Sequence, residues 1–86
     1  MLFSVVVETR LRPGIADPQG ATIARSLPTL GFTGIRGVRV GKAMRFELEA
    51  PDETTALAQA TDVTQRFLIN PVIEAADVSV SVAESV

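Results

Sequence analysis

Hydrophobic and polar side chains alternate along the first part of the chain, over residues 2–12. One side of the alternation carries Phe3, Val5, Val7, Thr9 and Leu11. The other side is rich in serine, glutamate and arginine. A period of two residues predicts a β-strand with one buried face. Pro13-Gly14 follows, and this pair is typical of a turn that ends a strand.

A helical pattern comes next, between Asp17 and Gly31. Asp17 offers a carboxylate that caps a helix, and Pro18 suits the first helical position because the N–H there has no partner. Apolar residues then recur at helical spacing, at Ile23, Ala24, Leu27 and Leu30. Gly31 suits the end of the helix. Because Pro28 lacks an N–H and crowds the preceding turn, we expect a kink there or a final turn that is not α-helical.

The following segment is predicted to form two strands, over residues 35–40 and 44–50, joined by a turn at Gly41-Lys42. Apolar and charged residues alternate strictly in the second of these strands. A two-residue turn would place Val38 and Val40 on its charged face, whereas an odd loop or a bulge would place them on its apolar face. The sequence leaves both registers open.

A second helix is predicted from Pro51-Asp52 to Asn70-Pro71. Its apolar stripe consists of Ala56, Ala60, Val63 and Phe67, widened by Leu57, Thr64 and Leu68. Apolar residues then alternate with serine over residues 78–82, which predicts a last strand. Residues 83–86 are expected to fray.

The predicted order of elements is therefore β-α-β-β-α-β within a single domain, residues 1–86. This order with short connections is typical of a ferredoxin-like α+β sandwich. We expect a four-stranded antiparallel sheet with two helices on one face. A chain of 86 residues suits one hydrophobic core.

The composition indicates that the chain associates with other chains. Hydrophobic residues make up 47% of it, and it contains neither cysteine nor histidine. Domains this small often depend on disulfides, metals or oligomerisation. Because the residues for the first two are missing, we expect a homo-oligomer, either a dimer or a tetramer.

The charge of the chain argues against two classes of partner. The net charge is −2, so no positive field attracts nucleic acid or anionic lipid. No apolar run approaches the ~20 residues of a membrane span, and the first residues lack the basic segment of a signal peptide. We expect a cytoplasmic protein that binds neither nucleic acid nor membrane.

Side chains for catalysis are scarce. Without histidine, cysteine or tyrosine, a catalyst would depend on carboxylates, hydroxyls or the single lysine, Lys42. Glu47 and Glu49 alternate along one strand, which is more typical of a solvated sheet face than of a catalytic pair. The glycines of residues 34–41 do not match a phosphate-binding loop. We expect no catalytic, cofactor-binding or metal-ligating residue in this chain.

Four short segments stand out by their order and spacing across nearly the whole chain. They are Asp17-Pro18-Gln19-Gly20, Leu30-Gly31-Phe32, Val38-Arg39-Val40-Gly41-Lys42 and Asn70-Pro71-Val72-Ile73-Glu74. None is diagnostic alone, but together they resemble the PurS family, the small subunit of bacterial and archaeal phosphoribosylformylglycinamidine synthase. Pro28 and Ala75-Ala76 depart from the family's expected pattern.

The resemblance implies a role in purine biosynthesis, in the ATP-dependent conversion of formylglycinamide ribonucleotide and glutamine to formylglycinamidine ribonucleotide. In this family PurQ releases ammonia from glutamine, and PurL holds ATP, magnesium and the ribonucleotide. PurS is a non-catalytic oligomer that brings PurL and PurQ together and assists ammonia transfer.

Four polar residues within these segments are predicted to contact the larger subunits. They are Arg39, Lys42, Asn70 and Glu74. Polar side chains at turns add little to folding, and the basic residues of the expected hairpin could steer an acidic surface toward it. A solvated hairpin that protects a sheet edge is the alternative. Pro18, Gly20, Gly31 and Pro71 instead suit local backbone roles at helix ends.

A different class of function is a small-molecule-sensing domain of the ACT type, which shares the β-α-β-β-α-β order. Such a domain would have a glycine-rich loop after its first strand. Residues 13–17 contain one glycine here. The sequence therefore favours the subunit over the sensor.

Overall fold

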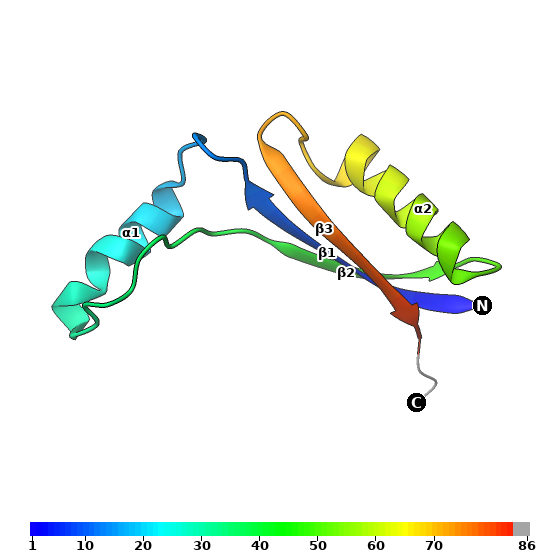
Figure 1. Ribbon diagram of the computed structural model, residues 1–86, viewed down its shortest axis with the longest axis horizontal. Helices are drawn as coiled ribbons and strands as arrows, with labels where there is room; N and C mark the ends of the chain where they lie inside the picture. Colours follow the sequence, from blue (N-terminus) through cyan, green and yellow to red (C-terminus); the bar gives the residue numbers. More distant parts are fainter. Residues whose placement is uncertain (84–86) are drawn as a thin grey trace.

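The structure is a computed structural model that describes residues 1–83. In chain order its elements are β1 (Leu2–Leu11), α1 (Pro18–Ser26), η1 (Pro28–Leu30), β2 (Ala43–Glu49), α2 (Glu53–Val63), η2 (Thr64–Leu68) and β3 (Glu74–Val82) (Figure 1). η1 is a 3₁₀ turn and η2 is a π-helical turn. The predicted strand over residues 2–12 and the two predicted helices are present.

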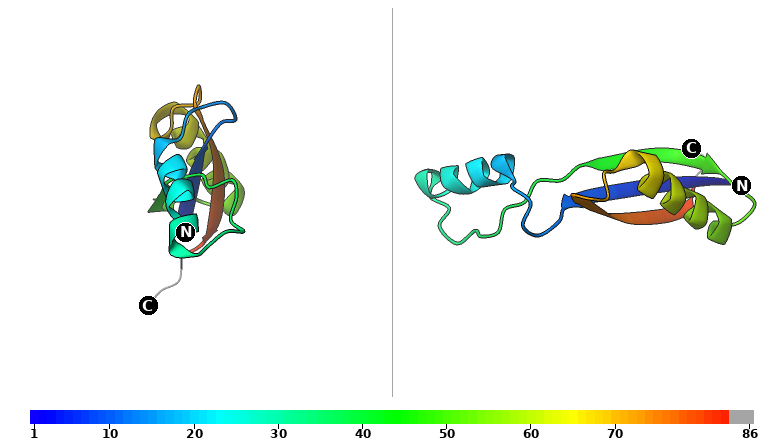
Figure 2. Two further views of the ribbon diagram at one scale, coloured as in Figure 1. Left: turned by 90° about the vertical axis from the view of Figure 1, so that its left-hand side faces the viewer. Right: turned by 90° about the horizontal axis from the view of Figure 1, so that it is seen from above.

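The sheet is antiparallel and has the order β2-β1-β3, with β1 in the centre. Val5 lies opposite Phe46 on one side and opposite Val80 on the other. The alternation of β1 places Phe3, Val5 and Val7 on one face, where each is almost fully buried. α2 covers this face (Figure 2), so the core lies between α2 and the sheet.

The expectation of a four-stranded sheet is wrong, because the described chain forms three strands. Residues 35–40 are not a strand, and Gly41-Lys42 is not a hairpin turn. Instead the Thr9 N–H donates to the Lys42 carbonyl oxygen at 2.8 Å. Gly41 and Lys42 therefore lie alongside β1, and the chain continues from them into β2. A Cβ on Gly41 would overlap the Thr9 carbonyl oxygen. Gly41 therefore permits close backbone approach, and the question of hairpin register does not arise.

The expectation that both helices cover one face of the sheet is also wrong. α1, η1 and the chain that returns from them project beyond the sheet (Figures 1 and 2); we call residues 18–40 the arm. The radius of gyration is 16.7 Å, compared with about 12 Å for a compact chain of this length. Within α1 only Gly20 is buried. The arm therefore adds little to the core.

The end of α1 follows the prediction made from Pro28. The α-helix stops at Ser26, and residues 28–30 form a 3₁₀ turn that begins with Pro28. Gly31 then adopts a left-handed conformation with a φ of 94°. Proline cannot continue the α-helical hydrogen bonds, and glycine tolerates the positive φ that closes the turn.

The buried stripe of α2 differs from the predicted one. Ala56, Ala60 and Thr64 are fully buried, whereas Val63 and Phe67 are 37% and 82% exposed. η2 accounts for the exposure of Phe67, since its π-helical hydrogen bonds change the helical period after residue 63. Val63 precedes this change and lies beside the buried stripe of α2. β3 begins four residues earlier than predicted. The predicted fraying of residues 83–86 lies, apart from residue 83, outside the described residues.

Candidate functional site

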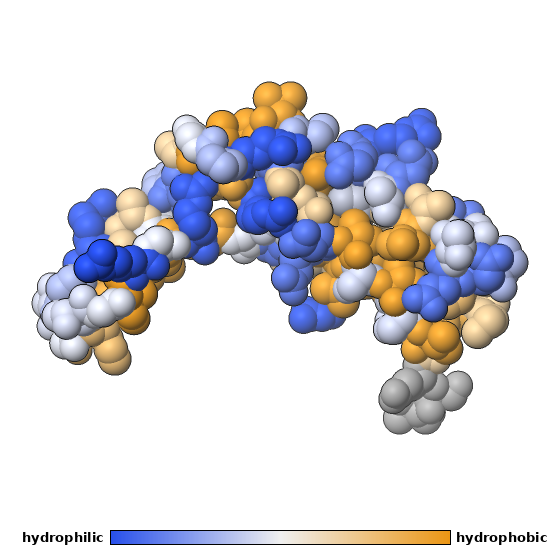
Figure 3. Space-filling view, viewed as in Figure 1, coloured by the Kyte–Doolittle hydropathy of each residue, from blue (hydrophilic) through white to orange (hydrophobic). Residues whose placement is uncertain are grey.

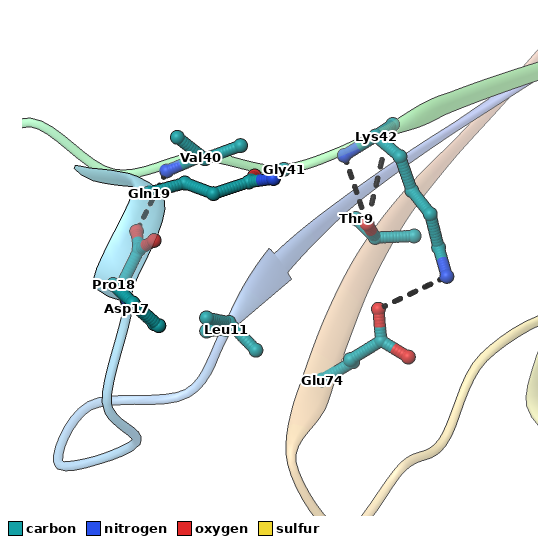
Figure 4. Close-up of a pocket in the computed structure, with 9 residues that line it drawn as sticks. All are labelled: Thr9, Leu11, Asp17, Pro18, Gln19, Val40, Gly41, Lys42 and Glu74. Atoms are coloured by element: carbon teal, nitrogen blue, oxygen red, sulfur yellow. Dashed lines mark hydrogen bonds and ion pairs between the residues drawn. The ribbon is translucent and has the colours of Figure 1, made fainter. Parts of the chain in front are cut away.

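A shallow cavity of about 400 Å³ lies where the arm meets the sheet (Figure 4). Its lining comes from the end of β1, the start of α1, the segment before β2 and the start of β3. The residues are Thr9, Leu11, Asp17, Pro18, Gln19, Val40, Gly41, Lys42 and Glu74. We call this region the junction.

Asp17 connects the two chain segments of the arm. One carboxylate oxygen, Oδ1, accepts a hydrogen bond from the Gly20 N–H at 2.9 Å and caps α1. The other, Oδ2, accepts from the Val40 N–H at 2.7 Å, on the returning segment. The Arg39 Nε atom lies 3.9 Å from the same oxygen. Asp17 thereby holds α1 against residues 38–40.

This environment favours the charged form of Asp17. The hydrogen bond from Gly20 and then that from Val40 hold the pKa of its carboxyl below the ordinary value, and the Arg39 guanidinium acts in the same direction. Burial opposes these effects, because it disfavours the charged form. Gly20 has no room for a side chain here, since a Cβ would lie 2.6 Å from both Asp17 Oδ2 and the Val38 carbonyl oxygen.

Glu74, on the sheet side of the junction, also connects two chain segments through its carboxylate. Its Oε1 atom accepts a hydrogen bond from the Asn70 N–H at 2.9 Å, and its Oε2 atom lies 3.6 Å from Lys42 Nζ. The Asn70 N–H is the main cause that lowers the pKa of Glu74, and Lys42 adds to it. Asn70 Oδ1 accepts from the Val72 N–H at 3.1 Å, which closes the turn before β3.

The structure brings three of the predicted interface residues into one cluster, Lys42, Glu74 and Asn70. Arg39 lies on the arm side of the junction, where it also donates to the Ile15 carbonyl oxygen at 3.3 Å. Lys42 has a partner from a distant part of the chain, because Glu74 faces it (Figure 4). The expected basic hairpin does not form.

Sequence reasoning missed the second contact of Asp17. Its position before Pro18 indicated the helix cap, but nothing local indicated the bond to Val40, which lies 23 residues away. Thr9 was also missed, although its Oγ1 atom accepts from the Lys42 N–H at 3.2 Å. An inward-facing threonine on an otherwise apolar strand face was the available signal.

The junction is suited to fixing the position of the arm. Its carboxylates accept hydrogen bonds from backbone N–H groups and face basic side chains, so their charges are already compensated. Within residues 1–83 no group of three or more potential metal ligands occurs. The same residues include no helix long and apolar enough to cross a membrane.

The chain is an elongated α+β protein in which the arm projects from a three-stranded sheet. The sequence model of the PurS family, described as phosphoribosylformylglycinamidine (FGAM) synthase, matches residues 4–82. The chain belongs to the PurS family and is thus a subunit of FGAM synthase, an enzyme of purine biosynthesis.

Curated relatives and solved structures agree with this assignment. The chain is similar to the PurS subunits of Mycobacterium leprae (48% identity, 80% of this chain and 84% of the relative) and Synechocystis (44% identity, 74% and 64%). It thus spans less than two thirds of the Synechocystis subunit. Among solved structures it is similar to the purS subunit of FGAM synthase from Thermotoga maritima (28% identity, TM-score 0.86, 94% and 93%) and to a chain in the PurLQS structure from that organism (28% identity, TM-score 0.85, 94% and 99%). These matches do not favour the ACT-type sensor.

Proposed function

We propose that this chain is the non-catalytic subunit that joins the glutaminase PurQ to the synthetase PurL in a cytoplasmic complex. The observation that carries the proposal is the likeness of the chain to a chain of the PurLQS structure from Thermotoga maritima. The arm adds exposed apolar surface through which the chain can associate. Four of its large apolar side chains are 44–68% exposed, namely Ile23, Leu30, Phe32 and Ile35. Apolar residues are visible at the surface of the arm, at the left of Figure 3. Exposed apolar surface of this kind is typical of protein interfaces.

The side chains of the chain support a non-catalytic role. It has no histidine, cysteine or tyrosine to supply acid–base or nucleophilic catalysis at neutral pH. In line with what the family resemblance implies, we place the ATP and magnesium sites on PurL and the glutaminase chemistry on PurQ. The chain would assist ammonia transfer by holding PurL and PurQ in a fixed position relative to each other. The similar chain from Thermotoga maritima is part of a PurLQS assembly, which supports this arrangement.

The arm also supports self-association into a dimer or a tetramer. A side chain such as Leu30, which is 68% exposed, gains about 1.5–3 kcal/mol when it is fully transferred from water to an apolar contact. A second copy of the chain would cover the arm, and the compact shape that the monomer lacks would then arise from the oligomer.

The four predicted interface residues divide by exposure. The side chains of Arg39 and Lys42 are 43% and 58% exposed, so their charges reach solvent and are available to an acidic partner surface. The side chain of Glu74 is only 14% exposed. Glu74 would therefore act by positioning Lys42 and, through the hydrogen bond from the Asn70 N–H, the turn before β3, whereas Asn70 itself is exposed.

Reconstitution tests the proposal. PurL and PurQ would be assayed with and without this chain, once with glutamine and once with ammonium chloride as the nitrogen source. We expect glutamine-dependent turnover to require the chain and ammonium-dependent turnover by PurL to be nearly independent of it. Glutamine-dependent turnover that is unchanged without the chain would contradict the joining function.

A further inference from the structure

Phe67 is the most exposed large apolar side chain among residues 1–83, at 82%. It lies in η2, at the end of α2. Its neighbours Thr64 and Ile69 are buried, so the backbone that carries Phe67 is anchored to the core. Because this turn is anchored, fraying of the helix end does not explain why the aromatic ring is exposed to solvent.

The π-helical turn is the direct cause of this exposure. Phe67 follows Ala56 by eleven residues, close to three α-helical turns, so a continuous α-helix would turn Phe67 toward the sheet. The Ile69 N–H instead donates to the Thr64 carbonyl oxygen at 3.1 Å, which closes a wider turn. Thr64 is fixed in turn by its hydroxyl, which donates to the Ala60 carbonyl oxygen at 2.7 Å. Such wide turns are rare and frequently occur at functional sites.

The surroundings of Phe67 indicate the chemistry of what binds it. A shallow hollow is lined by Asp62, Val63, Arg66 and Phe67. Arg66 and Asp62 form an ion pair at 3.3 Å across one helical turn. Because these two charges compensate one another, the complementary surface needs no net charge. An aromatic side chain with a polar rim is the usual arrangement at the energetic centre of a protein interface.

We propose that Phe67 inserts into an uncharged, apolar pocket of a non-identical subunit of the complex; this inference rests on the joining function proposed above. Self-association is assigned to the arm, which lies at the opposite end of the molecule from α2 in two perpendicular views (Figures 1 and 2). A second copy that covers the arm would not need to contact the outer face of η2. A subunit that joins different proteins needs such a second face.

Three single variants of the full chain test this docking site in the reconstituted complex with PurL and PurQ. Phe67→Ser removes the ring, Phe67→Leu keeps an apolar side chain, and Gln65→Ser is a control in the same turn. We expect Phe67→Ser to weaken binding to the larger subunits at least tenfold, Phe67→Leu to weaken it less, and Gln65→Ser to leave it unchanged. The loss should be nearly independent of salt, because the contact is uncharged. Melting temperature and sedimentation of the free chain should not change.

Other outcomes overturn the inference in distinguishable ways. If the unmodified chain forms a complex and Phe67→Ser binds as tightly, the docking site is elsewhere and the joining function stands. If Phe67→Ser changes the sedimentation of the free chain, a second copy occupies this face. If the unmodified chain binds neither larger subunit, the joining function and the docking site both fail.

Discussion

Lys42 Nζ lies 3.6 Å from Glu74 Oε2, so a residue just before β2 faces the first residue of β3. These two strands occupy opposite edges of the sheet, with β1 between them. The ion pair therefore spans the end of the sheet from which the arm projects. Both residues belong to segments on which the family resemblance rests, which makes the pair a suitable place to separate folding from partner binding.

Reversal of charge at Lys42 should affect both folding and assembly. Lys42→Glu places a carboxylate opposite Glu74, so we expect the melting temperature to fall by a few degrees. Lys42→Gln should change it less, because it removes attraction without adding repulsion. If Lys42 also faces an acidic surface of PurL, Lys42→Glu should weaken binding more at low salt than at high salt. Binding to PurL that Lys42→Glu leaves unchanged at both salt concentrations would remove Lys42 from the interface.

Acid should destabilise the fold through Asp17, Asp52 and Glu74. Backbone N–H donors lower the pKa of each below its ordinary value, with Thr55 as the donor for Asp52. The unfolded chain therefore binds more protons than the folded chain as the pH falls below the ordinary values. The stability from these groups is fully present above about pH 5 and is lost as the pH falls through the folded-state pKa values.

Thermal melts between roughly pH 6 and pH 2.5 measure this effect. Glu74→Gln should make the decline in melting temperature shallower. Glu47→Gln, on the exposed face of β2, is the matched control for the loss of one carboxylate. A Glu74→Gln variant with the same acid dependence as the unmodified chain would show that Glu74 does not contribute to it.

Gly41→Ala should destabilise the fold strongly. The added Cβ would overlap the Thr9 carbonyl oxygen, and both atoms belong to backbone that cannot move without disturbing β1. We expect a loss of about 1–3 kcal/mol in the free energy of unfolding, as for other overpacked sites. Gly34→Ala is the control, because no atom of residues 1–83 outside its own chain neighbours lies within 4 Å of its Cβ position. Urea denaturation of the two variants should therefore give clearly different midpoints.

Charge introduced on the arm should disrupt self-association. Leu30 and Phe32 are 68% and 55% exposed, so replacing either with aspartate should leave the folded monomer intact. In the oligomer the same carboxylate would be buried against apolar surface, which is unfavourable. We expect sedimentation to shift from a dimer or tetramer toward a monomer. A monomeric unmodified chain at tens of micromolar would contradict the assignment of the arm.

Local chemistry made much of this structure predictable from the sequence. The alternation of β1 and the caps at Asp17 and Asp52 depend on neighbouring residues, and all three are present. The failure at residues 35–40 has a different origin, because an alternating segment forms a strand only where another strand edge is available. Whether such an edge is available depends on the tertiary structure, which the periodicity of the sequence does not reveal.

The candidate site was predictable only in part for the same reason. Lys42, Asn70 and Glu74 were identified as polar residues at turns, but their mutual contacts join segments far apart in the chain. Phe67 was assigned to the core because the analysis of helical spacing assumes a constant period. One π-helical turn breaks that assumption and moves the ring into solvent.

The uncovered arm should also affect how fast the free chain is degraded in a cell. Much of the arm lies outside the hydrogen-bonded sheet and away from the core, so it is expected to open locally far more often than β1 does. Proteases cleave such segments first, and assembly would shield them. Newly made chains would therefore be degraded quickly unless they bind their partner subunits. Degradation of unbound chains would keep the amount of this subunit equal to the amount that the complex contains.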